Sequence, residues 1–195
     1  DALKYEAAAM IASGANCNFG DQLHPNGTID SSTYENIGYA FNYAEQIEAY
    51  GIGGKPISRL GLWRSFDQDC DEGLSKILLE NHIDFDVANF SKDFSEYSVL
   101  IFPSKTQLSA AEVSKVKNFI ESGGSVITLA KSLLNFTEDN VSEAFGVTYV
   151  SDSNFDCDYT LIKDALYPIF VKTPFLNYDA AIQVKPTSKV KVLAD

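Results

Sequence analysis

Cysteine and histidine are scarce in this chain of 195 residues, which has three of the former and two of the latter. Cys17, Cys70 and Cys157 stand at long, irregular spacings and form no Cys-x-x-Cys pair, so the sequence predicts neither a zinc knuckle nor a dithiol redox motif. A thiol nucleophile needs an electropositive setting. Cys70 and Cys157 each lie between two aspartates instead, so we expect no thiol chemistry at either position.

Long apolar runs and basic residues are also in short supply. No apolar run approaches the roughly 20 residues that a membrane helix needs. The chain has 15 Lys and Arg against 27 Asp and Glu, a formal net charge of −12, and such a surface repels phosphate backbones and anionic lipid headgroups. We therefore expect neither nucleic acid nor membrane as a partner, whereas neutral ligands such as sugars meet no repulsion.

A glycine-rich phosphate-binding turn is missing as well. Nucleotide-binding α/β proteins place glycines after the first strand, so that backbone N–H groups can approach phosphate. The corresponding turn here, residues 64–72, has no glycine and four carboxylates, which excludes a flavin or dinucleotide cofactor. Its Asp67-x-Asp69-x-Asp71 pattern is similar to a calcium loop, but the required glycine comes one residue late and Leu78 replaces the final glutamate. We expect no cofactor and no metal, and interpret these carboxylates as helix-dipole partners.

Two segments of different character meet at the Gly- and Pro-rich stretch 51–56, which is typical of a linker. The segment before it begins at Asp1 with nothing similar to a signal peptide, and we expect the chain to be part of a longer protein. This first domain, 1–54, should contain a well-covered alanine-rich helix, a short buried strand and a second helix. The residues predicted for them are 3–12, 15–20 and 32–50, with a capping box at Ser32-x-x-Glu35 and an apolar stripe of Tyr34, Ile37, Phe41, Ala44 and Ile47.

The second segment, 55–195, alternates buried strand-like runs with capped helices. Strands are predicted over 57–63, 83–87, 97–102, 125–130 and 147–150, and helices over 72–82, 109–122 and 141–145. This order predicts a flavodoxin-like, three-layer α/β/α domain with a mainly parallel sheet of about five strands. Beyond residue 151 only extended stretches at 169–171 and 189–193 stand out, as edge or antiparallel strands.

A compact polar turn follows the predicted strand of the first domain. Asp21, Gln22 and His24 offer a carboxylate, an amide and an imidazole within four residues, and such groups hold sugar hydroxyls in many proteins. A loop that only satisfies its own backbone, with Pro25 stiffening its exit, is the alternative. These three residues are the candidate substrate-binding residues.

The phrase Gly20-Asp-Gln-Leu-His-Pro25, followed by a tyrosine-rich helix, resembles glycoside hydrolases of the α-amylase/α-fucosidase-like type, in which a beta-galactosidase trimerisation domain follows a TIM barrel. Leu62-Trp63 and the stretches 94–103 and 116–124 resemble that trimerisation domain. The resemblance implies that 1–54 is a barrel remnant holding the last strand and its flanking helices, and that 20–25 faces the sugar pocket. The catalytic carboxylates would then lie outside this chain, so we assign no catalytic residue and expect the chain alone to be inactive.

The trimerisation domain is related in fold to class I glutamine amidotransferases, which carry a Gly-x-Cys-x-Gly elbow. The matching turn, 129–133, has neither the cysteine nor the glycines, which argues against amidotransferase chemistry. The resemblance thus implies a non-catalytic accessory or oligomerisation role in a glycoside hydrolase, with carbohydrate as partner of the parent and a homo-oligomer as its assembly. An amidotransferase-like enzyme acting on a small molecule and a stand-alone interaction module are the alternatives. A periplasmic or secreted location is favoured over a cytoplasmic one.

Overall fold

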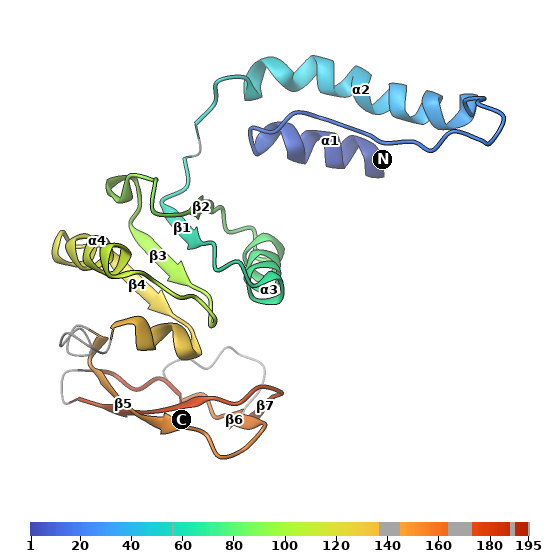
Figure 1. Ribbon diagram of the computed structural model, residues 1–195. Coiled ribbons are helices and arrows are strands. Elements are labelled where there is room, and N and C mark those ends of the chain that lie inside the picture. Colours follow the sequence, from blue (N-terminus) through green and yellow to red (C-terminus); the bar gives the residue numbers. More distant parts are fainter. Residues whose placement is uncertain (56, 137–144, 164–172, 188–189, 195) are drawn as a thin grey trace. The chain divides into compact units, whose positions relative to one another are not determined.

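The computed structural model of the protein describes residues 1–55, 57–136, 145–163, 173–187 and 190–194. The chain forms two compact units, Asp1–Ile57 and Ser58–Asp195 (Figure 1). None of the described helices is both long enough and apolar enough to cross a membrane.

The first unit is a pair of helices, α1 (Ala2–Ala12) and α2 (Ser31–Gly51), which pack against each other. The two helices approach each other closely at Gly51, where an added Cβ would lie 2.5 Å from Cγ2 of Ile11. Glycine is therefore required there by space rather than by backbone conformation.

Helix α2 begins one residue earlier than its predicted capping box. Asp30 is the N-cap, and its carboxylate accepts hydrogen bonds from the backbone N–H groups of Ser32 and Thr33. The predicted Ser32–Glu35 box is therefore wrong, because a charged and equally favoured capping residue stands two positions ahead of Ser32.

Two further expectations for this unit are corrected. Residues 15–24 have no regular structure, because the ladder of a strand needs a partner and no strand is described within this unit. Helix α1 is not well covered: Ala7 is its one buried residue, and Tyr5 is 76% exposed. The stripe on α2 is buried at Ala44 and half-buried at Ile37 and Ile47, but it is exposed at Tyr34 and Phe41.

The second unit is built on a parallel sheet of four strands, which confirms the predicted α/β class. The strands are β1 (Leu60–Trp63), β2 (Asp86–Ala88), β3 (Val99–Phe102) and β4 (Ser125–Thr128), in the order β2-β1-β3-β4. The chain moves outward from β1 to β2 and then crosses to β3 on the other side, so the order reverses between β1 and β3.

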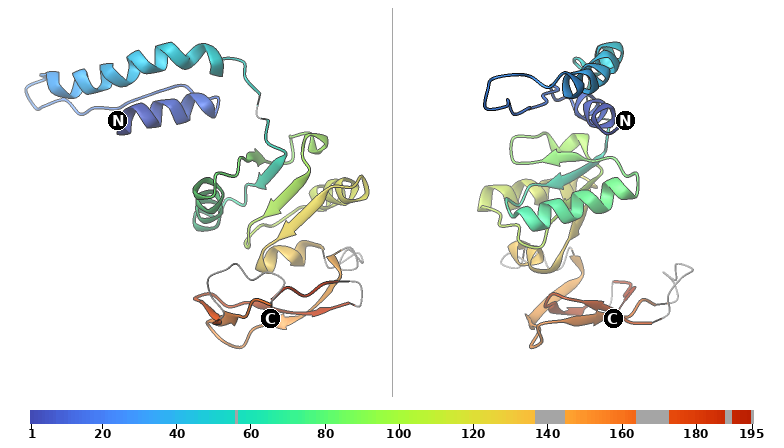
Figure 2. Two further views of the ribbon diagram at one scale, coloured as in Figure 1. Left: turned by 180° about the vertical axis from the view of Figure 1, so that it is seen from behind. Right: turned by 90° about the vertical axis from the view of Figure 1, so that its right-hand side faces the viewer.

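Helices α3 (Gln68–Glu80) and α4 (Ala110–Glu121) cover opposite faces of this sheet (Figure 2). On the α4 face, Leu100 and Phe102 of β3 pack with Val116 and Phe119, while on the other face a smaller cluster joins the strands to α3. That smaller cluster consists of Leu62, Ile101 and Leu78, with Leu60, Leu74, Phe85, Val99 and Leu129 at its margin. These two cores give the domain its three layers.

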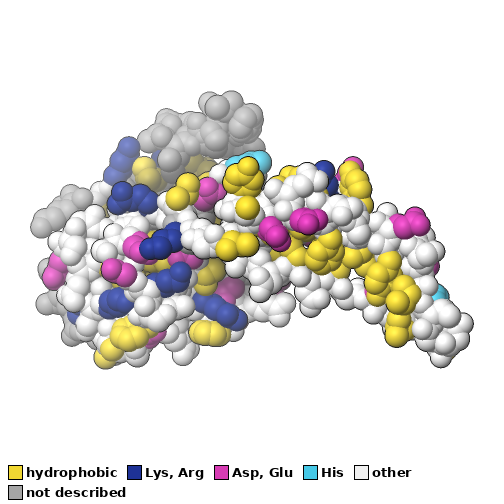
Figure 3. Space-filling view, turned by 90° about the horizontal axis from the view of Figure 1, so that it is seen from above, with side chains coloured by type: hydrophobic (Ala, Val, Ile, Leu, Met, Phe, Trp, Pro, Cys, Tyr) yellow, Lys and Arg dark blue, Asp and Glu magenta, His cyan; other side chains and the backbone are white. Residues whose placement is uncertain are grey.

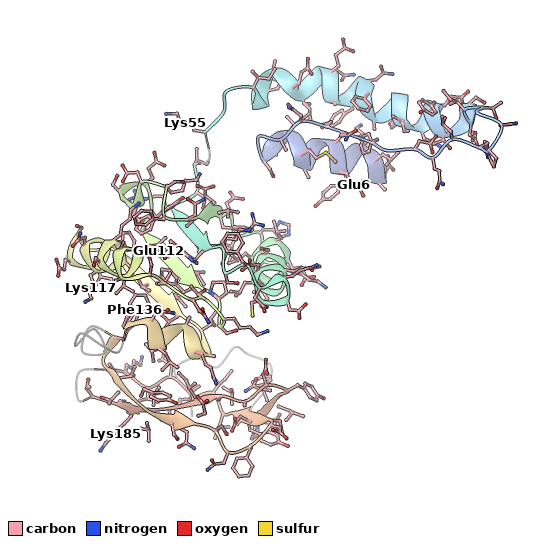
Figure 4. The ribbon with its side chains drawn as sticks, viewed as in Figure 1. Glu6, Lys55, Glu112, Lys117, Phe136 and Lys185 are labelled. Carbon is pink, nitrogen blue, oxygen red and sulfur yellow. The ribbon has the colours of Figure 1, made fainter. Side chains whose placement is uncertain are left out.

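Two local features fix this arrangement. The predicted capping box of α4 is confirmed: Ser109 accepts from the N–H of Glu112, whose carboxylate accepts in turn from the N–H of Ser109. Glu112 is labelled on α4 in Figure 4. Gly61 lies at the centre of the sheet, where an added Cβ would stand 2.7 Å from Cδ2 of Leu100 and 3.0 Å from Cβ of Ala88.

The remaining strands are antiparallel. They are β5 (Val147–Asp152) with β8 (Ile182–Pro186), and β6 (Asp158–Thr160) with β7 (Phe175–Asn177). The expectation that 147–150 forms a fifth parallel strand is thus wrong, because the burial of β5 alternates along the strand, as in a sheet with one solvated face. Most of the predicted helix 141–145 and the predicted strand 169–171 lie outside the described residues. Two short 3-10 helices, η1 (Phe94–Glu96) and η2 (Ala130–Phe136), complete the fold.

Candidate functional site

The loop predicted to bind sugar is exposed along its whole length from Gly20 to Pro25. Asp21 folds back on its own backbone, since its Oδ1 accepts a hydrogen bond from the N–H of Gln22 at 2.9 Å. The carbonyl of His24 accepts from the N–H of Gly27 at 2.8 Å, which closes a turn around Pro25. Within the described part of the chain, the side chains of Gln22 and His24 make no hydrogen bond, so both remain available to a ligand.

The carboxyl edge of the parallel sheet is the second candidate, because ligands of open α/β sheets bind outside this edge where the strand order reverses. The loops that follow β1 and β3 meet there. Lys105 donates to Oδ2 of Asp67 at 2.9 Å, and Sγ of Cys70 lies 3.2 Å from Oγ of Ser104. Sequence and topology thus bring an ion pair and a thiol–hydroxyl pair to the edge where a ligand would bind.

Asp67 is committed to structural contacts at this edge. It is the N-cap of α3, and its Oδ1 accepts from the N–H of Cys70 at 3.1 Å while Oδ2 accepts from Lys105. The hydrogen bond from Lys105, followed by that from Cys70, lowers the pKa of Asp67 to about 2, and the same contact raises the pKa of Lys105. The carboxylate joins the β1 and β3 loops and is not a free base.

The acidic loop 67–71 does not gather into a cation site. No group of three or more His, Cys, Asp or Glu side chains in the described ranges could hold a metal ion. Asp71 is engaged as well: Oδ1 accepts from the N–H and the hydroxyl of Ser65 at 2.9 and 2.6 Å, and Oδ2 from the N–H of Phe66 at 3.1 Å.

The turn after β4 has the strained backbone typical of a nucleophile elbow but carries no nucleophile. Ala130 has a φ of 43°, in the left-handed region that side chains avoid, and its methyl group has no lone pair to attack a substrate. Ser132 is fully buried. Its hydroxyl accepts a hydrogen bond from the N–H of Leu129 at 2.8 Å and donates one to the carbonyl of Phe102 at 3.1 Å. Lys131 forms an ion pair with Asp152, with 2.7 Å between Nζ and Oδ2. The groups at this turn hold it in place.

The turn after β1 is a feature that the sequence analysis missed. Phe66 has a φ of 63°, unusual for an aromatic residue, and its side chain is 83% exposed. The three hydrogen bonds of Asp71 described above fix this conformation. The spacing of Ser65, Phe66 and Asp71 carries no recognised motif, so only the structure could have revealed it.

One face of the parallel sheet is incompletely covered. Strand register aligns Val87, Leu62, Ile101 and Ile127 in a row across β2, β1, β3 and β4 on the α3 side. The two inner residues are 4% and 7% exposed, whereas Val87 and Ile127 at the ends are 46% and 47% exposed. Helix α3 therefore buries the middle of the row and leaves an apolar margin at each edge.

The helical unit, taken by itself, also carries exposed apolar side chains. Figure 3 shows hydrophobic side chains along its surface, and Tyr39, Tyr50 and Ile52 are each more than half exposed. Both units thus carry apolar side chains that the chain itself does not cover.

Residues 76–145 match the family model of the "Beta-galactosidase trimerisation domain". Among solved structures, the chain is similar to alpha-L-fucosidase isoenzyme 2 from Paenibacillus thiaminolyticus, with 29% identity and a TM-score of 0.83 over 99% of this chain and 31% of that chain. It also has the fold of part of the beta-galactosidase from Rahnella sp. R3, with 10% identity and a TM-score of 0.73 over 100% of this chain and 35% of that one. The chain spans about a third of the length of these two glycosidases.

A glutamine amidotransferase from Thermotoga maritima shares the fold at lower similarity, with 9% identity and a TM-score of 0.51 over 72% of this chain and 67% of that protein. No curated protein matches the chain. The expected resemblance to glycosidases and the expected amidotransferase-like fold are confirmed. Residues 76–145 thus match a beta-galactosidase trimerisation domain, and the chain as a whole resembles part of a glycoside hydrolase.

Proposed function

We propose that this chain is the non-catalytic assembly part of a glycoside hydrolase, and that it associates into a homotrimer through its α/β unit. The family match over 76–145 is the observation that carries this proposal, since the family is named for trimerisation. The turn after β4 supports an accessory role, because neither Ala130, which has the positive φ, nor Lys131, which stands at the cysteine position of Gly-x-Cys-x-Gly, carries a thiol.

The sheet face on the α3 side is the surface that we assign to self-association. Ile127 lies on the edge strand β4, beside the buried Ile101, and is half exposed. Apolar side chains that continue a buried row are typical of an interface core. A second copy seated there would complete a layer that α3 leaves open over β4.

Multi-angle light scattering on the 195-residue chain tests the assembly. We expect a mass three times the 21.4 kDa of one chain at micromolar concentration, with dissociation on dilution. A mass of one chain at every concentration would contradict the proposal. No hydrolysis of aryl β-galactosides or aryl α-fucosides is expected of this chain, and turnover by it would contradict the non-catalytic assignment.

We further propose that residues 1–54 complete the barrel of the parent enzyme, so that the two domains are 1–54 and 55–195. Support comes from α1, which is apolar except at Lys4 and Glu6 yet buries only Ala7 in the helical pair. A helix of this composition is normally surrounded by protein. A barrel wall would supply that cover.

The loop 20–25 would then lie at the sugar pocket of the parent, with Asp21, Gln22 and His24 binding hydroxyl groups. Their exposure and the free side chains of Gln22 and His24 support this role. In the parent enzyme, Gln22→Ala and His24→Ala should each raise KM for the glycoside about tenfold, the effect of one lost hydrogen bond of about 1.4 kcal/mol, and leave Tm within 1–2 °C. Asn26→Ala, which removes a side chain bonded only to Thr28, is the matched control. Unchanged KM in both variants would show that the loop is only structural.

A further inference from the structure

We propose that a cleft beside β1 is a binding site for a neutral pyranose sugar. The cleft has a volume of about 420 Å³ and is lined by Arg64, Phe66, Gln68, Asp71, Glu72 and Ser75. Its volume falls within the range of small-molecule sites. All its residues belong to the second unit.

The floor of the cleft is one face of α3. Gln68, Asp71, Glu72 and Ser75 follow one another at helical spacing, so their side chains share that face. The carboxylate of Asp71 already accepts hydrogen bonds from Ser65 and Phe66. The hydroxyl of Ser75 donates to the backbone carbonyl of Asp71 at 2.7 Å. In the described part of the chain, the side chains of Gln68 and Glu72 make no hydrogen bond. They are exposed, and can donate to and accept from a ligand.

The wall of the cleft is an aromatic ring backed by a guanidinium. Cζ of Arg64 lies 4.8 Å from the centroid of the Phe66 ring, so the cation occupies one face of the ring and the ring remains largely open to solvent. Because Phe66 is held in the left-handed region by Asp71, its ring is presented at the mouth of the cleft rather than folded into the core.

The charges of the cleft select the class of ligand. An anion would meet the acidic residues of the 67–72 segment, and a metal ion would find Asp67 paired with Lys105 and both oxygens of Asp71 already accepting hydrogen bonds. A neutral ligand that offers an apolar face to the ring and hydroxyl groups to Gln68, Glu72 and Arg64 meets neither obstacle. A pyranose has this combination, since its axial C–H bonds form an apolar face and its hydroxyls surround the rim.

The test is an NMR titration of the ¹⁵N-labelled 195-residue chain with methyl β-D-galactopyranoside and methyl α-L-fucopyranoside. The choice of these two sugars rests on the proposed function. We expect saturable shifts of the amide signals of residues 64–75, with a Kd on the order of 1 mM for at least one of the two sugars. Glucitol, which has hydroxyls but no ring, should not produce them.

Four variants test whether the sugar binds in this cleft. Phe66→Ala should weaken binding about tenfold or more, whereas Phe66→Tyr, which keeps the ring, should bind within a factor of about three. Gln68→Ala provides a second test that leaves the turn intact. Phe155→Ala, at another exposed phenylalanine, is the matched control and should bind like the unmodified chain.

Absence of saturable shifts with both sugars, equal shifts with glucitol, or unchanged binding in both Phe66→Ala and Gln68→Ala would overturn the proposal. The light-scattering mass is a separate readout, so loss of the sugar site and loss of the assembly role can be told apart.

Discussion

Ile101 and Ile127 are register partners on the adjacent strands β3 and β4, yet the first is 7% exposed and the second 47%. Both point to the same face of the sheet, because partners in a parallel pair share a face. The difference arises because α3 covers the centre of the sheet and not its β4 edge. A half-exposed isoleucine loses about half of the free energy that full burial would give, a loss of roughly 1 kcal/mol. A partner subunit that covered Ile127 would recover this free energy.

Gly61 should be irreplaceable at the centre of the sheet. We expect Gly61→Ala to lower the free energy of unfolding by about 1–3 kcal/mol, since its Cβ would press on Leu100 and Ala88. Gly73→Ala is the control: it lies in α3 with nothing within 4 Å of the added methyl group, and alanine should stabilise the helix by up to about 1 kcal/mol. Urea denaturation measures both, and equal effects of the two substitutions would refute the close-packing argument.

Replacing Ala130 with glycine should relieve the backbone strain in the turn after β4. Ala130 has a φ of 43°, which costs an L-residue about 1–2 kcal/mol, so Ala130→Gly should raise Tm by about 2–4 °C for each kcal/mol gained. Ala111→Gly, in the first turn of α4, should lower Tm instead. A lower Tm for Ala130→Gly would mean that the turn is not strained.

The Asp67–Lys105 pair gives stability a specific dependence on pH. The pKa of Asp67 is lowered from 3.8 to about 2 in the folded chain, so its contribution is complete above pH 4 and is lost as the pH falls towards 2. NMR titration of the Asp67 carboxyl carbon should give a midpoint near 2. In Lys105→Met the midpoint should move up towards 3.8; a midpoint that stays near 2 would show that Lys105 is not the main cause.

The α/β domain was readable from the sequence because its signals are local and agree with one another. The run at 97–102 is apolar without interruption, as expected for a strand buried on both faces, and Ser109 with Glu112 marks the start of α4. Helix α3 was predicted to begin at residue 72, four residues late. Its N-cap, Asp67, was instead counted among the carboxylates of a possible metal loop.

The strands beyond residue 146 depended on partners that local patterns do not reveal. β5 pairs with β8, about thirty residues further along the chain. Its burial alternates in the structure, but its sequence does not alternate apolar and polar residues, since Val150 is on the exposed side. The segment 15–20 has the composition of a buried strand, but composition cannot supply the neighbouring strand that its ladder requires.

The candidate sites were predictable to different degrees. Asp21, Gln22 and His24 stood out by residue type, and their exposure is consistent with a binding loop or a structural one. The Phe66 cleft was not foreseen, because it depends on a left-handed turn and on a carboxylate five residues away. Such contacts emerge only when the backbone path is known.

The most direct test of the account is sedimentation equilibrium of the 195-residue chain beside two charged variants, Ile127→Asp and Ile57→Asp. Ile57 is 90% exposed in the connection between the units, so its substitution controls for the added charge. We predict a trimer for the unmodified chain and for Ile57→Asp, and a monomer with an unchanged far-UV circular dichroism spectrum for Ile127→Asp. A monomeric unmodified chain, or a trimer that survives Ile127→Asp, would contradict assembly through this face.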